Sequence, residues 1–259
     1  MKTAIISDIQ HFCVSDGDGI RTTVFFKGCN LRCKWCHNVE CISEMPQKLR
    51  YVIGAKEKIV DCGKTVTVEE VLQELLEDKR FYENSGGGVT FSGGEPLLQS
   101  EFLAVLMQRV KEHGIHCIVD TAGDVPFAAF ARVIPYTDTF FFDIKAANSE
   151  DFLKYTCGNF ENVLSNLRKL VAQNVDVVIR IPVIPNHNYS KEYMQKTCDL
   201  LREIGVKRVQ LLPFNRLGSA KYEALGKLYL YKNFETMQKS DLTELLEICA
   251  QYFDAKIDG

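Results

Sequence analysis

Short runs rich in β-branched and aromatic residues alternate with longer segments of helical periodicity along most of the chain. This alternation is typical of repeated βα units around a parallel sheet. We predict strands at 20–27, 88–92, 116–120, 139–144, 177–183 and 207–213. We predict helices at 67–83, 99–113, 126–134, 160–173, 190–204 and near 235–253. The pattern therefore predicts an α/β fold, but periodicity does not separate an incomplete barrel from a doubly wound open sheet.

The length and composition fit one folded domain over 1–259. The 259 residues are 46% hydrophobic, which is enough to bury a full core, and no long linker divides them. Residues 38–64 interrupt the alternation, and we expect them to form an irregular excursion. The first helix has the clearest start, because Thr67 and Glu70 have the spacing of a capping box.

Charge and hydropathy exclude some classes of partner. The chain has 31 Lys and Arg against 34 Asp and Glu, and no basic stripe that would neutralise a phosphate backbone. Its first residues have too short an apolar run for a signal peptide, and nowhere do about eighteen apolar residues follow one another. We therefore expect a cytoplasmic protein that binds neither nucleic acid nor a membrane.

Three of the ten cysteines, Cys29, Cys33 and Cys36, lie within eight residues. Thiolates at this spacing can converge from a loop on zinc or on an iron–sulfur cluster. His37 directly follows a cysteine, so its side chain points apart and makes an awkward fourth ligand, whereas Cys41 could complete a zinc site. A cubane held by three thiolates keeps one iron open, which indicates catalysis. Spacing alone leaves both metals open.

Polar residues recur where predicted strands end. Gly93, Gly94 and Glu95 follow the strand at 88–92, where glycines permit a ligand to approach the backbone, although a plain turn fits as well. The other strands end in or contain charged and amide residues, namely Asp120, Asp143, Lys145, Arg180 and Asn215. A single such residue is more often a cap or a surface ion pair, but their recurrence at the carboxyl ends favours a binding site.

The cysteine loop and the glycine segment resemble two motifs of a known enzyme family. The spacing C-x3-C-x2-C, with aromatic Trp35 before the last cysteine, resembles the motif of the radical S-adenosylmethionine (SAM) enzymes, and the segment ending in Gly94 and Glu95 resembles their GGE motif. This resemblance implies an incomplete (β/α)6 TIM-like barrel. It also implies a [4Fe–4S] cluster on the three cysteines, SAM on the open iron, and reduced flavodoxin or ferredoxin as electron donor.

Within that family the chain is most similar to activases of glycyl radical enzymes, such as pyruvate formate-lyase activating enzyme. The supporting stretches are DGDGIR, FFKGCNLRCKWCHN, SGGGVTFSGGEPLLQ, DTAG, FDIK and LLPFNRLG. The likeness implies that SAM is bound by Trp35, Cys36, His37, Gly93, Gly94, Glu95, Asp120, Asp143, Ile144, Lys145, Arg180 and Asn215. It further implies a monovalent cation beside Asp120 and Asp143.

Two positions depart from the activases and suggest a changed substrate. Asp18 stands where DGPGIR has proline, and Asn215 stands where activases usually carry histidine. We expect Asp16 and Asp18 to face the substrate, and carboxylates there suit a cationic small molecule. Our main hypothesis is a queuine lyase, which releases preQ1; the alternatives are a glycyl radical activase and a non-enzymatic zinc module. Only Cys41 and Cys62 fall within 38–64, so we expect one cluster and no ferredoxin-like insert.

Overall fold

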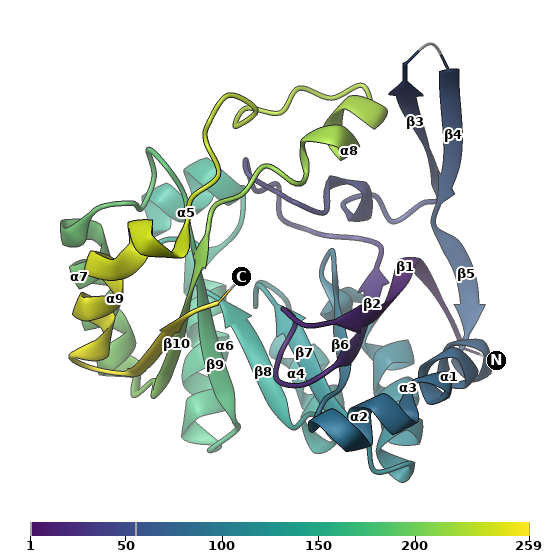
Figure 1. Cartoon of the computed structure of the whole chain (residues 1–259). Coiled ribbons are helices and arrows are strands. Elements are labelled where there is room, and N and C mark those ends of the chain that lie inside the picture. Colours follow the sequence, from purple (N-terminus) through teal and green to yellow (C-terminus); the bar gives the residue numbers. More distant parts are fainter. Residues whose placement is uncertain (1, 55, 259) are drawn as a thin grey trace.

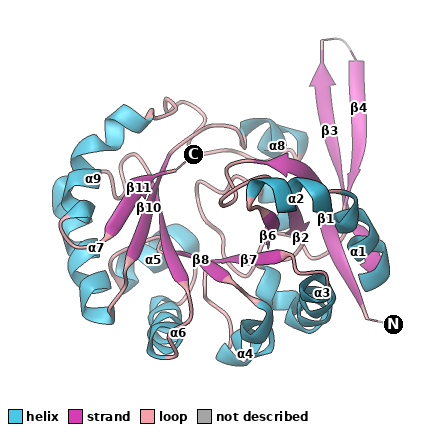
Figure 2. Cartoon of the chain, turned by 60° about the horizontal axis from the view of Figure 1, so that its bottom comes forward, coloured by secondary structure: helices cyan, strands magenta, loops and turns pink. Residues whose placement is uncertain are grey.

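The computed structural model describes residues 2–54 and 56–258. At its centre six parallel strands lie side by side in the order β2, β6, β7, β8, β9, β10. Their bounds are Arg21–Phe26, Gly88–Gly93, His116–Thr121, Thr139–Asp143, Val177–Val183 and Arg208–Pro213. Figure 2 shows that the sheet bends into an arc that does not close. The six predicted strands and the incomplete (β/α)6 barrel are confirmed.

Three further strands extend the sheet at its edges. β1 (Thr3–Cys13) runs antiparallel to β2, and β5 (Lys64–Thr67) runs antiparallel to β1. β11 (Asp254–Ile257) pairs in parallel with β10 at the other edge. The hydropathy pattern did not predict them, because the two outermost strands have only four residues each and β1 is exposed over much of its length. The barrel stays open between β11 and the loop that joins β1 to β2.

The helices are α1 (Val68–Glu77), α2 (Lys79–Ser85), α3 (Ser100–Glu112), α4 (Phe127–Val133), α5 (Ser149–Thr156), α6 (Phe160–Ala172), α7 (Lys191–Ile204), α8 (Ser219–Ala224) and α9 (Thr243–Ala250). Most of them cover the convex face of the arc (Figure 2), whereas α8 packs against Val39–Cys41 and Gln47–Ile53. Thr67 and Glu70 form the predicted capping box. None of the helices in the described ranges is both long and apolar enough to cross a membrane.

Several helix predictions need correction. The helix expected over 67–83 is two helices, because Asp78 turns inward at their junction. Its carboxylate lies 2.6 Å from the hydroxyl of Thr22 and 2.5 Å from Nδ1 of His11. The last helix is confined to α9 and is preceded by a 3-10 turn at Lys239–Leu242. The pattern also missed α5 and α8, which are short.

Residues 38–64 are more regular than expected. A 3-10 turn at Val39–Cys41 is followed by β3 (Gln47–Ile53) and β4 (Lys56–Cys62), which form an antiparallel hairpin that stands away from the barrel (Figure 1). Of β4 only Cys62 is buried. A hairpin that buries so little apolar surface needs no alternation of polar and apolar residues, so the expectation of an irregular excursion was wrong.

Alternation along the parallel strands positions the site. In β7, Cys117 and Val119 pack in the main core, whereas Ile118 and Asp120 point into the barrel. Ile118 joins Phe141 and Val178 in an apolar layer across the barrel interior. Two residues further along each strand, the next inward side chains are charged, and they lie above this layer at the carboxyl ends.

Candidate active site

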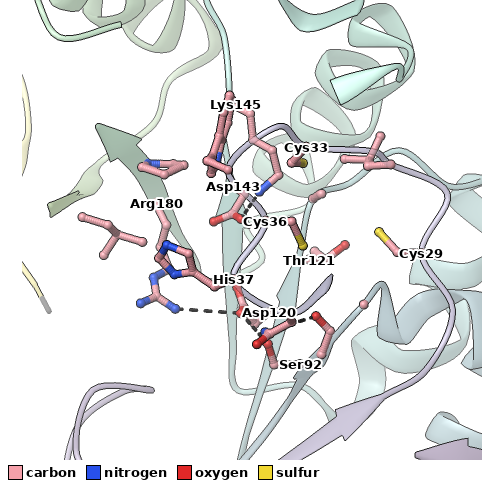
Figure 3. Close-up of a pocket in the computed structure, with 18 of the residues that line it drawn as sticks. Cys29, Cys33, Cys36, His37, Ser92, Asp120, Thr121, Asp143, Lys145 and Arg180 are labelled. Atoms are coloured by element: carbon pink, nitrogen blue, oxygen red, sulfur yellow. Dashed lines mark hydrogen bonds and ion pairs between the residues drawn. The ribbon is translucent and has the colours of Figure 1, made fainter. Parts of the chain in front are cut away.

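A cavity of about 360 Å³ lies at the carboxyl ends of the parallel strands. The cysteine loop forms one wall, and charged side chains from the strand ends face it (Figure 3). The predicted residues in its lining are Asp16, Cys29, Cys33, Trp35, Cys36, His37, Gly93, Gly94, Asp120, Asp143, Lys145, Arg180 and Asn215. Residues from seven segments of the sequence therefore converge on a single site.

Backbone hydrogen bonds hold the cysteine loop in place. Gly28, which has φ of +94°, donates its N–H to the carbonyl of Cys41 at 2.7 Å. Glycine suits this conformation, because a side chain is strained at such an angle. Trp35 is buried and stacks on His187 at 5.3 Å between ring centroids. The loop is thus fixed by the protein itself, and its three thiols face the cavity.

The donor set fits an iron–sulfur cluster with one open iron. Cys29, Cys33 and Cys36 are free thiols, and burial raises the pKa of Cys29 to about 12. Cys41 lies outside the cavity lining, with its sulfur 3.0 Å from the hydroxyl of Ser7. Within the described residues, no three or more His, Cys, Asp or Glu side chains are arranged around a position for a single metal ion. The three thiols in one wall match the ligand set of a cubane that leaves an iron for another ligand.

His37 is engaged in a different contact. Its Nε2 lies 3.1 Å from the carbonyl oxygen of Asn215, so this ring nitrogen links the cysteine loop to the segment after β10. Burial lowers the pKa of His37, which favours the neutral ring. We therefore assign His37 to the cavity wall and not to the ligands of the cluster.

The glycine segment after β6 lies directly against the cysteine loop. A Cβ on Gly94 would lie 2.2 Å from the carbonyl oxygen of Gly28, and a Cβ on Gly93 would lie 2.4 Å from the backbone nitrogen of Phe26. Such distances exclude any side chain at these two positions. The glycines therefore bring the backbone of this turn to the edge of the cavity, where a ligand can reach it.

Glu95 supports the site from behind and is absent from the cavity lining. Its fully buried carboxylate accepts hydrogen bonds from the hydroxyl of Thr121 at 2.8 Å and from the N–H of Ala122 at 3.0 Å. Burial raises the pKa of Glu95 to about 7, although these donors oppose the shift. The residue ties the end of β6 to the end of β7, so its effect on a ligand is indirect.

Charged side chains across the cavity are only partly paired. Asp120 accepts a hydrogen bond from Ser92 at 2.7 Å, and its contact with Arg180 is long, at 3.9 Å (Figure 3). Asp143 pairs with Lys145 at 2.5 Å. Burial and the nearby charge of Asp143 raise the pKa of Asp120 to about 6, and Nε of Arg180 is buried without a hydrogen-bond partner among the described residues. The arrangement suits a ligand that carries both an anionic and a cationic group.

Two other predicted residues lie away from the cavity. Ile144 is buried and donates its backbone N–H to the carbonyl of Arg180 at 2.9 Å. The side chain of Asp18 is 96% exposed and lies 3.7 Å from Lys256 of β11. Asp16 does line the cavity, and its carboxylate accepts a hydrogen bond from the hydroxyl of Thr23 at 2.7 Å. Of the two carboxylates expected to face the substrate, only Asp16 is in place.

Some residues of the cavity were not predicted. Ser92 and Thr121 each adjoin a predicted site residue at a strand end, so the rule that found Gly93 and Asp120 could have found them as well. Asp258 also lines the cavity. It follows β11, a four-residue strand without a hydropathy signal, so no pattern in the sequence selects it.

The chain is similar to proteins of known activity over nearly its whole length. A family model described as the radical SAM superfamily matches residues 23–201. The (2S)-3-sulfopropanediol dehydratase activating enzyme of Klebsiella oxytoca is 38% identical over 97% of this chain and 94% of its own length. The pyruvate formate-lyase 2-activating enzyme of Escherichia coli is 36% identical over 95% of this chain and 89% of its own length.

Solved structures agree on the fold. A radical SAM methyltransferase from Sphaerobacter thermophilus has a TM-score of 0.66 and 16% identity, covering 97% of this chain and 76% of that protein. The relatives with the high identities are activating enzymes, which favours the activase alternative over our queuine lyase hypothesis and leaves the latter without support among them. Family membership implies a [4Fe–4S] cluster and SAM, and so decides against zinc. This chain belongs to the radical SAM superfamily and is a radical SAM enzyme.

Proposed function

We propose that this chain activates a glycyl radical enzyme, by removing a hydrogen atom from a glycine of that partner. The similarity to activating enzymes over nearly the whole chain is the observation that carries this proposal. When bound, the cluster and SAM supply the 5′-deoxyadenosyl radical that takes the hydrogen atom. The protein itself binds and orients the reacting groups and excludes water from the site.

Each group in the cavity has a part in this proposal. Cys29, Cys33 and Cys36 would hold the cluster, and the backbone at Gly94 would receive the amino group of SAM. The guanidinium of Arg180 would bind the carboxylate of SAM, and a charge-assisted hydrogen bond there would satisfy its free N–H. All of these contacts would be made in a buried cavity, where electrostatic interactions are strong.

A monovalent cation fits beside the two aspartates. The charge of Asp143 contributes to the raised pKa of Asp120, so the two carboxylates repel each other when both are ionised. Lys145 and Arg180 compensate part of this charge, with contacts of 2.5 Å and 3.9 Å. A cation bound here would relieve the remaining repulsion and stabilise the ionised form of Asp120.

One observation favours a second candidate function. Asp16 lines the cavity with a carboxylate, as a cationic small molecule such as queuine would require. Its hydrogen bond from Thr23 satisfies only part of that carboxylate. A queuine lyase therefore remains the competing proposal, although Asp18 does not contribute to this cavity.

One experiment separates the two functions. Anaerobically reconstituted enzyme, SAM and reductant are combined with pyruvate formate-lyase, with (2S)-3-sulfopropanediol dehydratase, or with queuine. We expect a glycyl radical in electron paramagnetic resonance spectra of an acceptor protein, with formation of 5′-deoxyadenosine, and neither with Cys36→Ser. Release of preQ1 in proportion to 5′-deoxyadenosine would overturn the activase proposal in favour of the lyase.

A further inference from the structure

Three basic side chains lie on the outer face of the cysteine loop. Arg32 and Lys34 alternate with the ligating cysteines, and their backbone N–H groups bond to the carbonyls of Thr156 and Tyr155. These bonds, of 2.7 and 3.0 Å, join the loop to the end of α5, which carries Lys154. We call Arg32, Lys34 and Lys154 the basic face.

The cations of the basic face contact neutral groups of the protein. Arg32 donates from Nη1 only to the carbonyl oxygens of Cys29 and Leu31, at 2.6 and 2.8 Å. The ammonium groups of Lys34 and Lys154 each lie 5.0 Å from the centroid of the Tyr155 ring. Within the described ranges, none of the three cations has a carboxylate within 4.0 Å.

Two acidic residues of neighbouring segments, Asp124 and Asp151, are engaged by other partners. Asp124 accepts from the N–H of Asn159 at 2.9 Å and from the amide of Asn162 at 2.8 Å. Asp151, on the first turn of α5, accepts from the hydroxyl of Tyr193 at 3.0 Å. Lys34 and Lys154 lie over the same aromatic ring and repel each other, and Arg32 adds a third positive charge to the segment joined to α5. An anionic surface from another molecule would make the arrangement favourable.

The position of the basic face indicates what that molecule does. The three cysteines line the cavity, whereas Arg32 and Lys34, which flank Cys33 in the sequence, are absent from its lining, and Arg32 is exposed. Leu153 lies beside the cations and is 61% exposed, which adds an apolar contact to the charged surface. The chain as a whole has a net charge of −3, so a basic surface at this position is not a general property of the protein. An electron that enters here therefore arrives beside Cys33, one of the three predicted cluster ligands.

We propose that the basic face is the docking surface for an acidic one-electron carrier protein. The carrier loses one electron and the cluster gains it, and no bond forms or breaks in this step. Opposite charges steer the carrier to the loop and fix its orientation. The inference rests on the cluster of a radical SAM enzyme, and it holds whether the hydrogen donor is a glycine or a small molecule.

The test uses reconstituted enzyme and purified flavodoxin, an acidic electron carrier, as the probe. The variant is Lys34→Glu combined with Lys154→Glu, which leaves the bonds of Arg32 to the loop intact. The matched control is Arg168→Glu combined with Lys207→Glu, two exposed basic residues on α6 and before β10. We expect calorimetry to show flavodoxin binding at least tenfold weaker for the variant and within twofold of wild type for the control. Binding to wild type should weaken with salt.

A second measurement separates docking from damage to the cluster. SAM cleavage driven by reduced flavodoxin should fall at least fivefold in the variant, whereas cleavage driven by titanium(III) citrate should stay within twofold of wild type. The milder variant with glutamine at both positions should give an intermediate loss of flavodoxin affinity. Equal losses with both reductants, equal losses in the control, or unchanged flavodoxin binding would each overturn the proposal, whatever the outcome of the glycyl radical experiment.

Discussion

Two aspartates at opposite ends of the barrel experience opposite environments. Asp120, at the carboxyl end of β7, has its pKa raised to about 6, because burial and the charge of Asp143 disfavour its ionised form. Burial also disfavours the ionised form of Asp138, which lies just before β8, yet the pKa of Asp138 is lowered. The ammonium of Lys111 lies 2.7 Å from both of its oxygens, and the N–H of Cys117 donates to it.

The comparison distinguishes charged groups that stabilise the fold from charged groups that are suited to bind a ligand. At the amino end of β8, the carboxylate of Asp138 has a full set of donors. At the carboxyl ends, the Arg180 guanidinium has an N–H without a partner in the described part of the chain, and Asp120 has one hydrogen bond, from Ser92, and a cation only at 3.9 Å. In barrels of this kind, polar residues at the carboxyl ends serve binding and those at the amino ends serve stability. The comparison can be tested by neutralising one aspartate of each kind.

The largest effect is expected for Asp120→Asn, with opposite signs for binding and stability. SAM affinity, measured by calorimetry on reconstituted enzyme, should fall about tenfold to a hundredfold. The free energy of unfolding at pH 7.5, from denaturant titration, should rise by about 1 to 3 kcal/mol. Because the pKa of Asp120 is raised in the folded protein, ionising this carboxyl destabilises the folded state. The full destabilisation is present above about pH 6, and none of it remains below the ordinary pKa of 3.8.

The pH dependence provides the control for this variant. The substituted amide would carry no charge, so the gain over wild type should disappear at about pH 3.5 if the ionised carboxylate is its cause. A variant that is less stable than wild type at pH 7.5, or one that binds SAM normally, would show that Asp120 is a structural residue like Asp138.

Asp138→Asn should have a smaller effect that is confined to stability. The loss of its contact with Lys111 should lower the free energy of unfolding at pH 7 by about 1 to 2 kcal/mol. Because its pKa is lowered, this contribution is fully present above pH 3.8 and is lost as the pH falls through the folded-state pKa. The two proteins should therefore converge in acid, while SAM affinity stays unchanged. A double-mutant cycle with Lys111→Met gives the energy of the pair, and a coupling near zero would contradict this explanation.

The same contrast explains how much of the fold the sequence revealed. The six parallel strands are buried and carry dense apolar runs, so hydropathy found them all. β11 and β5 have four residues each, and β4 is mostly exposed, so burial left no pattern in their sequences. The break at Asp78 depends on contacts with His11 and Thr22, far away in the sequence. Local periodicity cannot report such contacts.

The site was predictable where its chemistry depends on neighbours in the sequence. The spacing of the cysteines and the strand-end position of Asp143 brought both to the cavity wall. Glu95 belongs to the GGE motif with Gly94, but its carboxylate points away from the cavity toward Thr121. The motif does not encode that side-chain orientation. Asp258 reaches the cavity only because β11 pairs with β10, a long-range contact of the folded chain.

The smallest effect is expected for Asp18→Asn, at the gap in the barrel. Its partner Lys256 lies across that gap at 3.7 Å, but the two side chains are 96% and 55% exposed, so water and salt screen the pair. The free energy of unfolding should change by less than about 0.5 kcal/mol. The rate of SAM cleavage should change less than twofold, because Asp18 is outside the cavity lining, whereas Asp16→Asn, which alters the lining, should change substrate KM. A tenfold loss of turnover in Asp18→Asn alone would show that the loop from β1 to β2 carries this carboxylate to the substrate during catalysis.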